Sequence, residues 1–281
     1  MKLHPLVLAL GLIPLVGCGG SDSSCPTPPP VADTTYSVRA VDGYLRGALV
    51  WLDLDGDFQP DVGEPVAISG EGGVAILDVS NTPNPENYSV VVKAIVGETV
   101  DEDTITETNP EGVATTTSFL LSAPAGQTVI TPLTTLVNIK MHNGLDQQQA
   151  TTEVATDLGI AEELLLGDYI AAEQADIAAK ANALVELDLL PESELQMQEI
   201  SQDASSLNEQ LESNLETVQS LTQEQRLIVD EDGNVIVATN IDSDDDGIID
   251  EKDAFPEDAN EWSDSDNDGF GNNSDAYIND A

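Results

Sequence analysis

The sequence Asp242-Ser-Asp-Asp-Asp-Gly-Ile-Ile-Asp-Glu-Lys-Asp253 returns in altered form as Asp264-Ser-Asp-Asn-Asp-Gly-Phe-Gly-Asn-Asn-Ser-Asp275. Both copies place oxygen-bearing side chains at positions 1, 3, 5, 9 and 12, and glycine at position 6. This spacing wraps a chain around a calcium ion, with the backbone carbonyl of position 7 as a further ligand. The expected metal ligands are Asp242, Asp244, Asp246, Ile248, Asp250 and Asp253 in the first tail loop, and Asp264, Asp266, Asp268, Phe270, Asn272 and Asp275 in the second.

The donor types at these positions favour calcium as the cofactor. Nitrogen and sulfur ligands are absent from both loops, which disfavours zinc and copper. Magnesium is an alternative, although it prefers to keep its water ligands. The other reading is a merely solvated acidic tail, but the repeat at an offset of 22 residues, from Asp242 to Asp264, argues against chance. Clustered carboxylates repel one another, so we expect calcium to supply folding free energy here.

Residues 241–281 resemble the thrombospondin type 3 repeats of bacterial surface proteins. The resemblance rests on the two loops and on the insert Asp253-Ala-Phe-Pro256 between them. It implies a segment with little regular structure that calcium organises.

A third acidic loop, Asp53-Leu-Asp-Gly-Asp-Phe-Gln-Pro-Asp-Val-Gly-Glu64, lies near the N-terminus and is called the strand loop below. Phe58 occupies position 6, where glycine is expected, so the alternative is a polar hairpin tip without an ion. Its candidate ligands are Asp53, Asp55, Asp57, Gln59, Asp61 and Glu64. Residues 38–79 resemble the B-type repeats of bacterial adhesins and related prealbumin-like modules, in which a strand leads into a calcium-stabilised loop.

The charge balance narrows the class of partner. The chain has 53 acidic and 8 basic residues, which argues against nucleic acid and against electrostatic docking on an anionic membrane. Divalent cations are the natural counter-charge. The general alternatives are solubility or adaptation to a salty environment.

The N-terminus predicts export and lipidation. An apolar run from Leu6 to Val16 follows a short positive start, and is too short to span a bilayer. It ends at Gly17-Cys18, which resembles a bacterial lipoprotein signal with cleavage before Cys18 and lipid attached to its sulfur. An ordinary secreted protein is the alternative. By the same resemblance, Gly19 favours the outer membrane of a Gram-negative bacterium. Cys25 is then left in a tether rich in proline and serine, without an intrachain partner.

The predicted fold is multidomain α+β. Short segments rich in β-branched residues predict a β-sandwich over residues 36–130, with strands that include a buried central one at Val90–Val96 and another at Val113–Leu121. Residues 131–225 predict a helical bundle, with helices from Pro132 to about Asn143, from Asp146 to Leu158, from Ala171 to Leu190, and from Pro191 to about Val218. A β-hairpin over 226–240 precedes the calcium repeats at 241–281, and the signal peptide (1–17) and lipidated tether (18–35) precede the strands.

No catalytic motif stands out. The sequence contains no Gly-x-Ser-x-Gly, no phosphate loop with lysine and no His-Glu-x-x-His, and His142 lies near a helix end where packing explains it. We therefore expect a calcium-binding, lipid-anchored envelope protein that is structural or adhesive and contacts a cell-surface protein or polysaccharide, and not an enzyme. The alternatives are a periplasm-facing lipoprotein that docks another envelope protein through its helices, and a carboxylate-dependent hydrolase of glycans.

Overall fold

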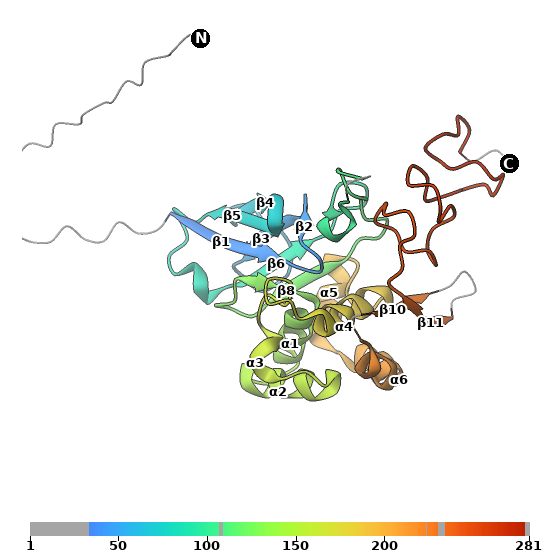
Figure 1. Cartoon of the computed structure of the whole chain (residues 1–281). Helices are drawn as coiled ribbons and strands as arrows, with labels where there is room; N and C mark the ends of the chain where they lie inside the picture. The colour runs from blue at the N-terminus through green and yellow to red at the C-terminus, as the bar shows by residue number, and fades with distance from the viewer. Residues whose placement is uncertain (1–33, 107–108, 223, 230–233, 279–281) are drawn as a thin grey trace, which may run out of the picture. The chain divides into compact units, whose positions relative to one another are not determined.

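A buried helix, α1 (Pro132–His142), connects the strands of this mixed α+β protein to the remaining helices (Figure 1). The computed structural model describes residues 34–106, 109–222, 224–229 and 234–278. The predicted signal peptide, Cys18 and most of the tether lie outside the described residues. In the described part, no helix is long and apolar enough to cross a membrane.

Four small sheets contain the strands. The largest has the order β4-β3-β6-β8 and is antiparallel throughout, and a second has the order β5-β1-β9 with β1 and β9 parallel. β2 pairs with β7, and β10 with β11. The strands are β1 (Thr35–Ala40), β2 (Leu45–Arg46), β3 (Leu49–Asp53), β4 (Val66–Ile68), β5 (Val74–Asp78), β6 (Ser89–Lys93), β7 (Val100–Asp101), β8 (Leu120–Ala123), β9 (Val129–Ile130), β10 (Gln225–Val229) and β11 (Val235–Thr239).

Val90, Val91 and Val92 lie in the internal strand β6, but the predicted strand is too long, because β6 ends at Lys93 and Val96 is 53% exposed. Val90, Val91 and Val92 are all fully buried, so both faces of this strand are covered. An unbroken apolar sequence is expected where neither face meets water. The strand predicted over Val113–Leu121 is wrong for most of its length, because only Leu120–Ala123 forms a strand and Ala114 makes a single bridge to Val100.

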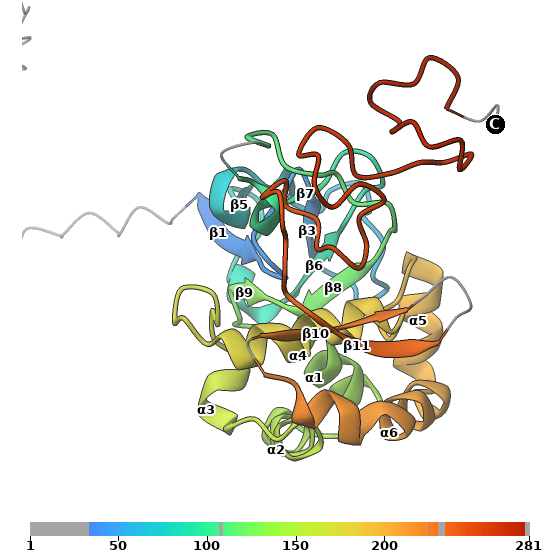
Figure 2. The same cartoon turned by 45° about the vertical axis from the view of Figure 1, so that its right-hand side comes forward.

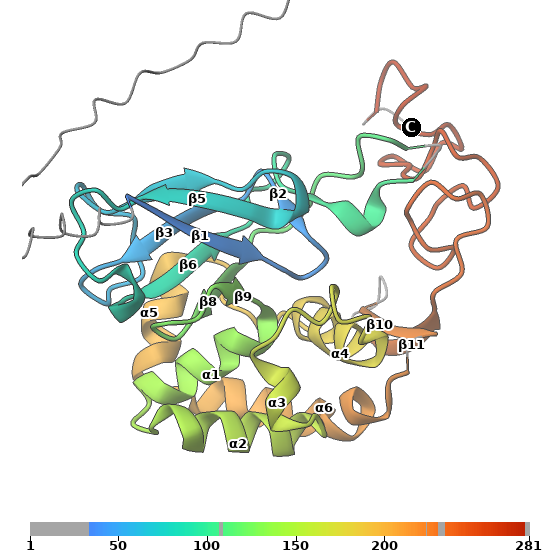
Figure 3. The same ribbon diagram turned by 60° about the vertical axis from the view of Figure 1, so that its left-hand side comes forward.

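Helix α1 begins at a capping box, in which Thr131 and Thr134 exchange side-chain and backbone hydrogen bonds. Its threonines also bind β8, since Thr135 Oγ1 accepts the Ser122 N–H at 2.9 Å and Thr134 Oγ1 donates to the Ser122 carbonyl at 2.9 Å. One set of buried apolar side chains therefore continues from the strands into the helices, across the boundary near residue 130 that the sequence predicts. In Figure 3, α1 lies directly below β8 and β9.

The other helices are α2 (Gln147–Leu158), α3 (Glu162–Leu165), α4 (Ala175–Glu186), α5 (Glu194–Gln202) and α6 (Ser205–Ser220). The single helix predicted from Pro191 to Val218 is wrong, because the chain is extended at Asp203 between α5 and α6. Asn143 stabilises this break: its Nδ2 donates to the Ile200 carbonyl at 3.1 Å and its Oδ1 accepts the Ala204 N–H at 3.1 Å. Asn143 thus satisfies backbone groups at the end of α5 and the start of α6, although it lies 57 and 61 residues before them in the chain.

The tail follows β11. Its described residues, 240–278, contain no helix or strand (Figure 2). The hairpin before it is confirmed, with Leu227 opposite Val237, although its turn lies outside the described residues.

Candidate metal centres

Three aspartate triads bring carboxylate oxygens within 4.8 Å of one another: Asp242, Asp244 and Asp246; Asp264, Asp266 and Asp268; and Asp53, Asp55 and Asp57. They are positions 1, 3 and 5 of the three loops that the sequence predicts. Three converging carboxylates supply hard oxygen ligands, so each triad could hold a metal ion.

The same pair of hydrogen bonds shapes all three loops. The carboxylate at position 1 accepts the N–H of position 6, from Gly247 to Asp242 (2.9 Å), from Gly269 to Asp264 (2.9 Å), and from Phe58 to Asp53 (3.2 Å). The carboxylate at position 5 accepts the N–H of position 7 at 2.8 Å, from Ile248 to Asp246, from Phe270 to Asp268, and from Gln59 to Asp57. The strand loop therefore has the local geometry of the tail loops.

Backbone torsions agree with this correspondence. Positions 4 and 6 have positive φ in every loop: Gly56 (83°) and Phe58 (62°), Asp245 (62°) and Gly247 (99°), and Asn267 (58°) and Gly269 (90°). A bulky residue seldom adopts this conformation. Phe58 does so while its side chain is only 2% exposed and its ring lies 5.0 Å from that of His142 on α1. Burial of the ring offsets the strain, which explains why position 6 tolerates phenylalanine.

The first tail loop holds buried carboxylate oxygens that lack partners. Both oxygens of Asp244, Oδ2 of Asp246 and Oδ2 of Asp253 are buried and accept no hydrogen bond from the described residues. Asp246 has no solvent exposure. Burial, followed by the nearby carboxylates of Asp244 and Asp253, raises the pKa of Asp246 to about 6. Burial likewise raises the pKa of Asp244 and of Asp253. Unpartnered buried carboxylates are costly, and a bound cation would remove that cost.

The second tail loop is more exposed, but it repeats this feature. Oδ1 of Asp264 and Oδ2 of Asp266 are buried and unpartnered among the described residues. The buried carboxylate of Glu261 supports the loop by accepting the Asn273 N–H at 3.0 Å. A β-carbon at residue 271 would lie 1.9 Å from Glu261 Oε2, so a side chain there would displace the Glu261 carboxylate. Glu261 was not among the predicted site residues, and Gly271 is the feature of the sequence that indicates a close approach here.

Position 9 closes each tail loop. Both carboxylate oxygens of Asp250 bind Ser243, through its N–H at 2.8 Å and its hydroxyl at 2.7 Å. Asn272 Oδ1 accepts the Ser265 N–H at 3.0 Å in the same way. Asp250 and Asn272 therefore both bind the serine at position 2 of their loops. An amide oxygen can accept this hydrogen bond as well as a carboxylate oxygen can.

Position 12 differs among the loops. Asp253 is 8% exposed, and its carboxylate interacts electrostatically with those of Asp242 and Asp244, so it lies with the first triad. Glu64 folds back into the strand loop, accepting the N–H groups of Leu54 (2.6 Å) and Asp61 (3.0 Å). Asp275 accepts the Tyr277 N–H at 2.8 Å instead.

The strand loop differs from the tail loops in the partners of its buried oxygens. Asp53 is buried, and its two oxygens accept the N–H groups of Gly56 (2.8 Å) and Phe58. Burial raises the pKa of Asp53 and that of Glu64. No oxygen of this loop is both buried and unpartnered within the described residues. By this measure the first tail loop is the best prepared for an ion and the strand loop the least.

The first tail loop is also fixed to the folded body. Asn109 Nδ2 donates to the Asp246 carbonyl at 3.1 Å, and Lys252 forms an ion pair with Glu186 of α4. A β-carbon at Gly247 would lie 2.4 Å from the Thr104 carbonyl oxygen. Contacts between residues so far apart in the chain cannot be predicted from local spacing.

In comparisons with known proteins, no family model, curated protein or solved structure matches the chain.

Proposed function

We propose that this protein is a calcium-binding, lipid-anchored component of the bacterial cell envelope, structural or adhesive in kind. The calcium part is supported by the buried carboxylate oxygens of Asp244, Asp246 and Asp253 that have no hydrogen-bond partner among the described residues. Each oxygen lies in a loop whose donor spacing suits calcium. Two such loops in sequence, as in thrombospondin type 3 repeats, and a β-sandwich formed by the two larger sheets are parts of the same proposal.

Calcium is favoured over magnesium by the number and flexibility of the donors. The first tail loop offers side-chain oxygens from Asp242, Asp244, Asp246 and Asp253, together with a backbone carbonyl at Ile248. Magnesium keeps several water ligands and demands near-ideal octahedral geometry, whereas calcium accepts six to eight oxygen ligands in a flexible geometry. With little regular structure of its own, the tail depends on such an ion for order.

Tryptophan fluorescence allows calcium binding to be followed separately at two of the loops. Trp51 and Trp262 are the chain's two tryptophans, and each stands two residues before a candidate loop. In Trp51→Phe the remaining emission reports the second tail loop, and in Trp262→Phe it reports the strand loop. We expect calcium to change the Trp262 emission and a chelator to reverse the change. If calcium alters neither emission nor thermal stability, the calcium proposal fails.

The anchor is tested separately in cells. Labelled palmitate should be incorporated into the protein and lost in Cys18→Ser, with Cys25→Ser as the matched control. Protease added to whole cells should cut the tail if it faces the medium and leave it intact if it faces the periplasm. Incorporation of label into Cys18→Ser would contradict the anchor without affecting the calcium proposal.

A further inference from the structure

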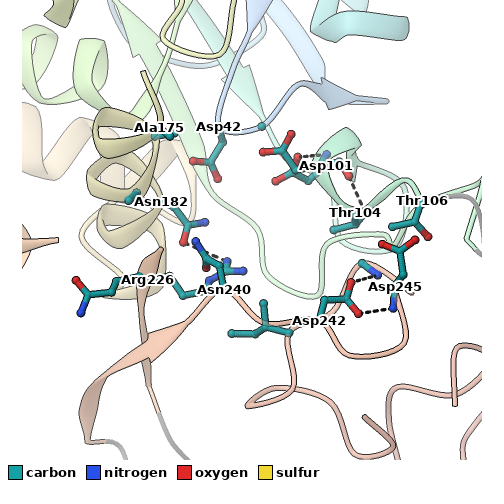
Figure 4. Close-up of a pocket in the computed structure, with 17 residues that line it drawn as sticks. Asp42, Asp101, Thr104, Thr106, Ala175, Asn182, Arg226, Asn240, Asp242 and Asp245 are labelled. Atoms are coloured by element: carbon teal, nitrogen blue, oxygen red, sulfur yellow. Dashed lines mark hydrogen bonds between the residues drawn. The ribbon is translucent and has the colours of Figure 1, made fainter. Parts of the chain in front are cut away.

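A cavity of about 420 Å³ lies between the strands, α4, β10 and the first tail loop (Figure 4). Asp42 and Asp101 enter it from the strand side, and Asn182 and Arg226 come from α4 and β10. The volume matches that of small-molecule sites. The metal triads do not include Asp42 or Asp101, but the cavity adjoins the first tail loop, since Asp242 and Gly247 contribute to its wall.

The buried carboxylate of Asp42 is the first indication that the cavity binds a ligand. It lies in the turn after β1, its residue is 7% exposed, and its Oδ1 is buried without a hydrogen-bond partner among the described residues. An unsatisfied buried acceptor destabilises the protein, and more so when the group is charged. Figure 4 shows this carboxylate facing the cavity. A ligand that donates a hydrogen bond and carries positive charge would satisfy it.

Asp101 lies against the turn that carries Asp42, next to Gly43. Asp101 Oδ1 accepts the Asp103 N–H at 2.9 Å. The same oxygen would lie 1.9 Å from a β-carbon at residue 43, so Gly43 is needed to admit the carboxylate. Asp101 is therefore held in place beside Asp42, and Asp103 adds a third carboxylate to the wall. Two carboxylates placed before the ligand arrives reduce the ordering cost of binding.

On the opposite side of the cavity, Arg226 supplies a hydrogen-bond donor. Nε of Arg226 is buried and unpartnered within the described part of the chain. The guanidinium is held by Asn182, whose Oδ1 accepts from Nη2 at 3.1 Å, and by Glu186 at 3.6 Å. An acceptor atom on the ligand would complete the hydrogen bonding of Arg226, since guanidinium N–H groups only donate.

The α4 wall is apolar and small. Ala175, Ala178 and Ala179 line it, leaving room for a short aliphatic body. The lining residues include no aromatic side chain, which disfavours a quaternary ammonium ligand, because such groups are usually held in aromatic cages. A bare metal ion is disfavoured as well, since Asp42, Asp101 and Asp103 do not form a triad with oxygens within 4.8 Å.

We propose that this cavity binds a small primary amine that also carries a carboxylate, the chemistry of a free amino acid. The ammonium group donates to Asp42 and Asp101, and the carboxylate accepts from Arg226. The proposal does not depend on calcium binding by the loops.

The test uses isothermal titration calorimetry with glycine, 4-aminobutyrate, 6-aminohexanoate and lysine, each in calcium and in chelator. Butylamine lacks the carboxylate and butyrate lacks the amine, so they are the matched ligand controls. We expect at least one amino acid to bind about tenfold or more tightly than both controls, since a charged hydrogen bond contributes about 1.5–3 kcal/mol. No binding of any amino acid in either condition would overturn the proposal, as would butylamine binding equally well.

Variants assign the two ends of the ligand. Asp42→Asn should abolish binding of the amino acid, while Glu209→Gln, an exposed acid on α6, should leave it unchanged. Arg226→Gln should weaken the amino acid about tenfold but leave any residual butylamine binding unaltered. Circular dichroism melts establish that each variant is folded. Unchanged affinity in both Asp42→Asn and Arg226→Gln would place the ligand elsewhere and contradict the assignment.

Discussion

At the scale of single residues, position 6 decides the shape of each loop. Gly247 and Gly269 share the left-handed conformation, at φ 99° and 90°. They differ in their surroundings, because a β-carbon at Gly247 would lie 2.4 Å from the Thr104 carbonyl, whereas one at Gly269 would meet nothing within 4 Å. Comparing substitutions at Gly247 and Gly269 therefore distinguishes the effect of backbone strain from the effect of losing a tertiary contact.

Gly247→Ala should weaken calcium binding and lower the thermal midpoint more than Gly269→Ala does. Both variants carry the conformational cost of about 1–2 kcal/mol for a left-handed alanine. Only Gly247→Ala also forces the loop away from Thr104. Melting curves in calcium and in chelator measure both effects, and equal shifts for the two variants would show that the docking contact is unimportant.

Phe58→Ala should destabilise the protein by about 3–5 kcal/mol, the usual cost of removing a buried aromatic side chain. The residue is 2% exposed and packs against His142. The control is Phe270→Ala at position 7 of the second tail loop. Phe270 is 65% exposed, so its removal should change stability little. Denaturant unfolding measures both, and a small effect of Phe58→Ala would mean that the strand loop is not anchored through its ring.

At the scale of elements, spacing in the sequence predicted the three loops because their geometry is local. Positions 1, 5, 6 and 7 of each loop bond to one another, so a twelve-residue pattern contains the information. The α5–α6 break could not be predicted in the same way, since Asn143 from the end of α1 supplies the partners. Nor could the sequence separate position 9, which closes the tail loops, from the converging positions 1, 3 and 5.

The acid cluster between β1 and η3 (Glu102–Thr104) predicts how stability changes with pH. Burial raises the pKa of Asp42 well above its usual value and, with Asp103 nearby, raises that of Asp101 to about 6. The folded state then binds protons more tightly than the unfolded state, so its stability is greatest below the unfolded pKa and falls as pH rises through the folded one.

In chelator, the free energy of unfolding should therefore decrease from about pH 4 to above pH 6, following the unfolded and folded pKa values of Asp101. Urea unfolding at several pH values measures this slope. Asp42→Asn should reduce it, because the variant removes one of the groups whose pKa is raised. Stability that rises over the same interval would contradict the assignment.

At the scale of the whole molecule, the acidic residues serve different purposes in different places. Those in the tail loops converge on candidate ion positions, and those around Asp42 face a cavity with Arg226 on its other side. The first tail loop contacts Thr104, Asn109 and Glu186 of the body. Calcium bound there would consequently stabilise more than the tail, since loop and body share contacts.

The most direct measurement of the central claim is a calorimetric calcium titration of the protein beside the paired variant Asp244→Asn, Asp246→Asn. The proposal predicts saturable binding by the parent, a higher thermal midpoint in calcium, and a clear loss of both in the variant. At calcium a hundredfold above its dissociation constant, each site should add about 2.7 kcal/mol to the free energy of unfolding. A parent protein that shows no calcium-dependent heat and no shift in its midpoint would contradict the account.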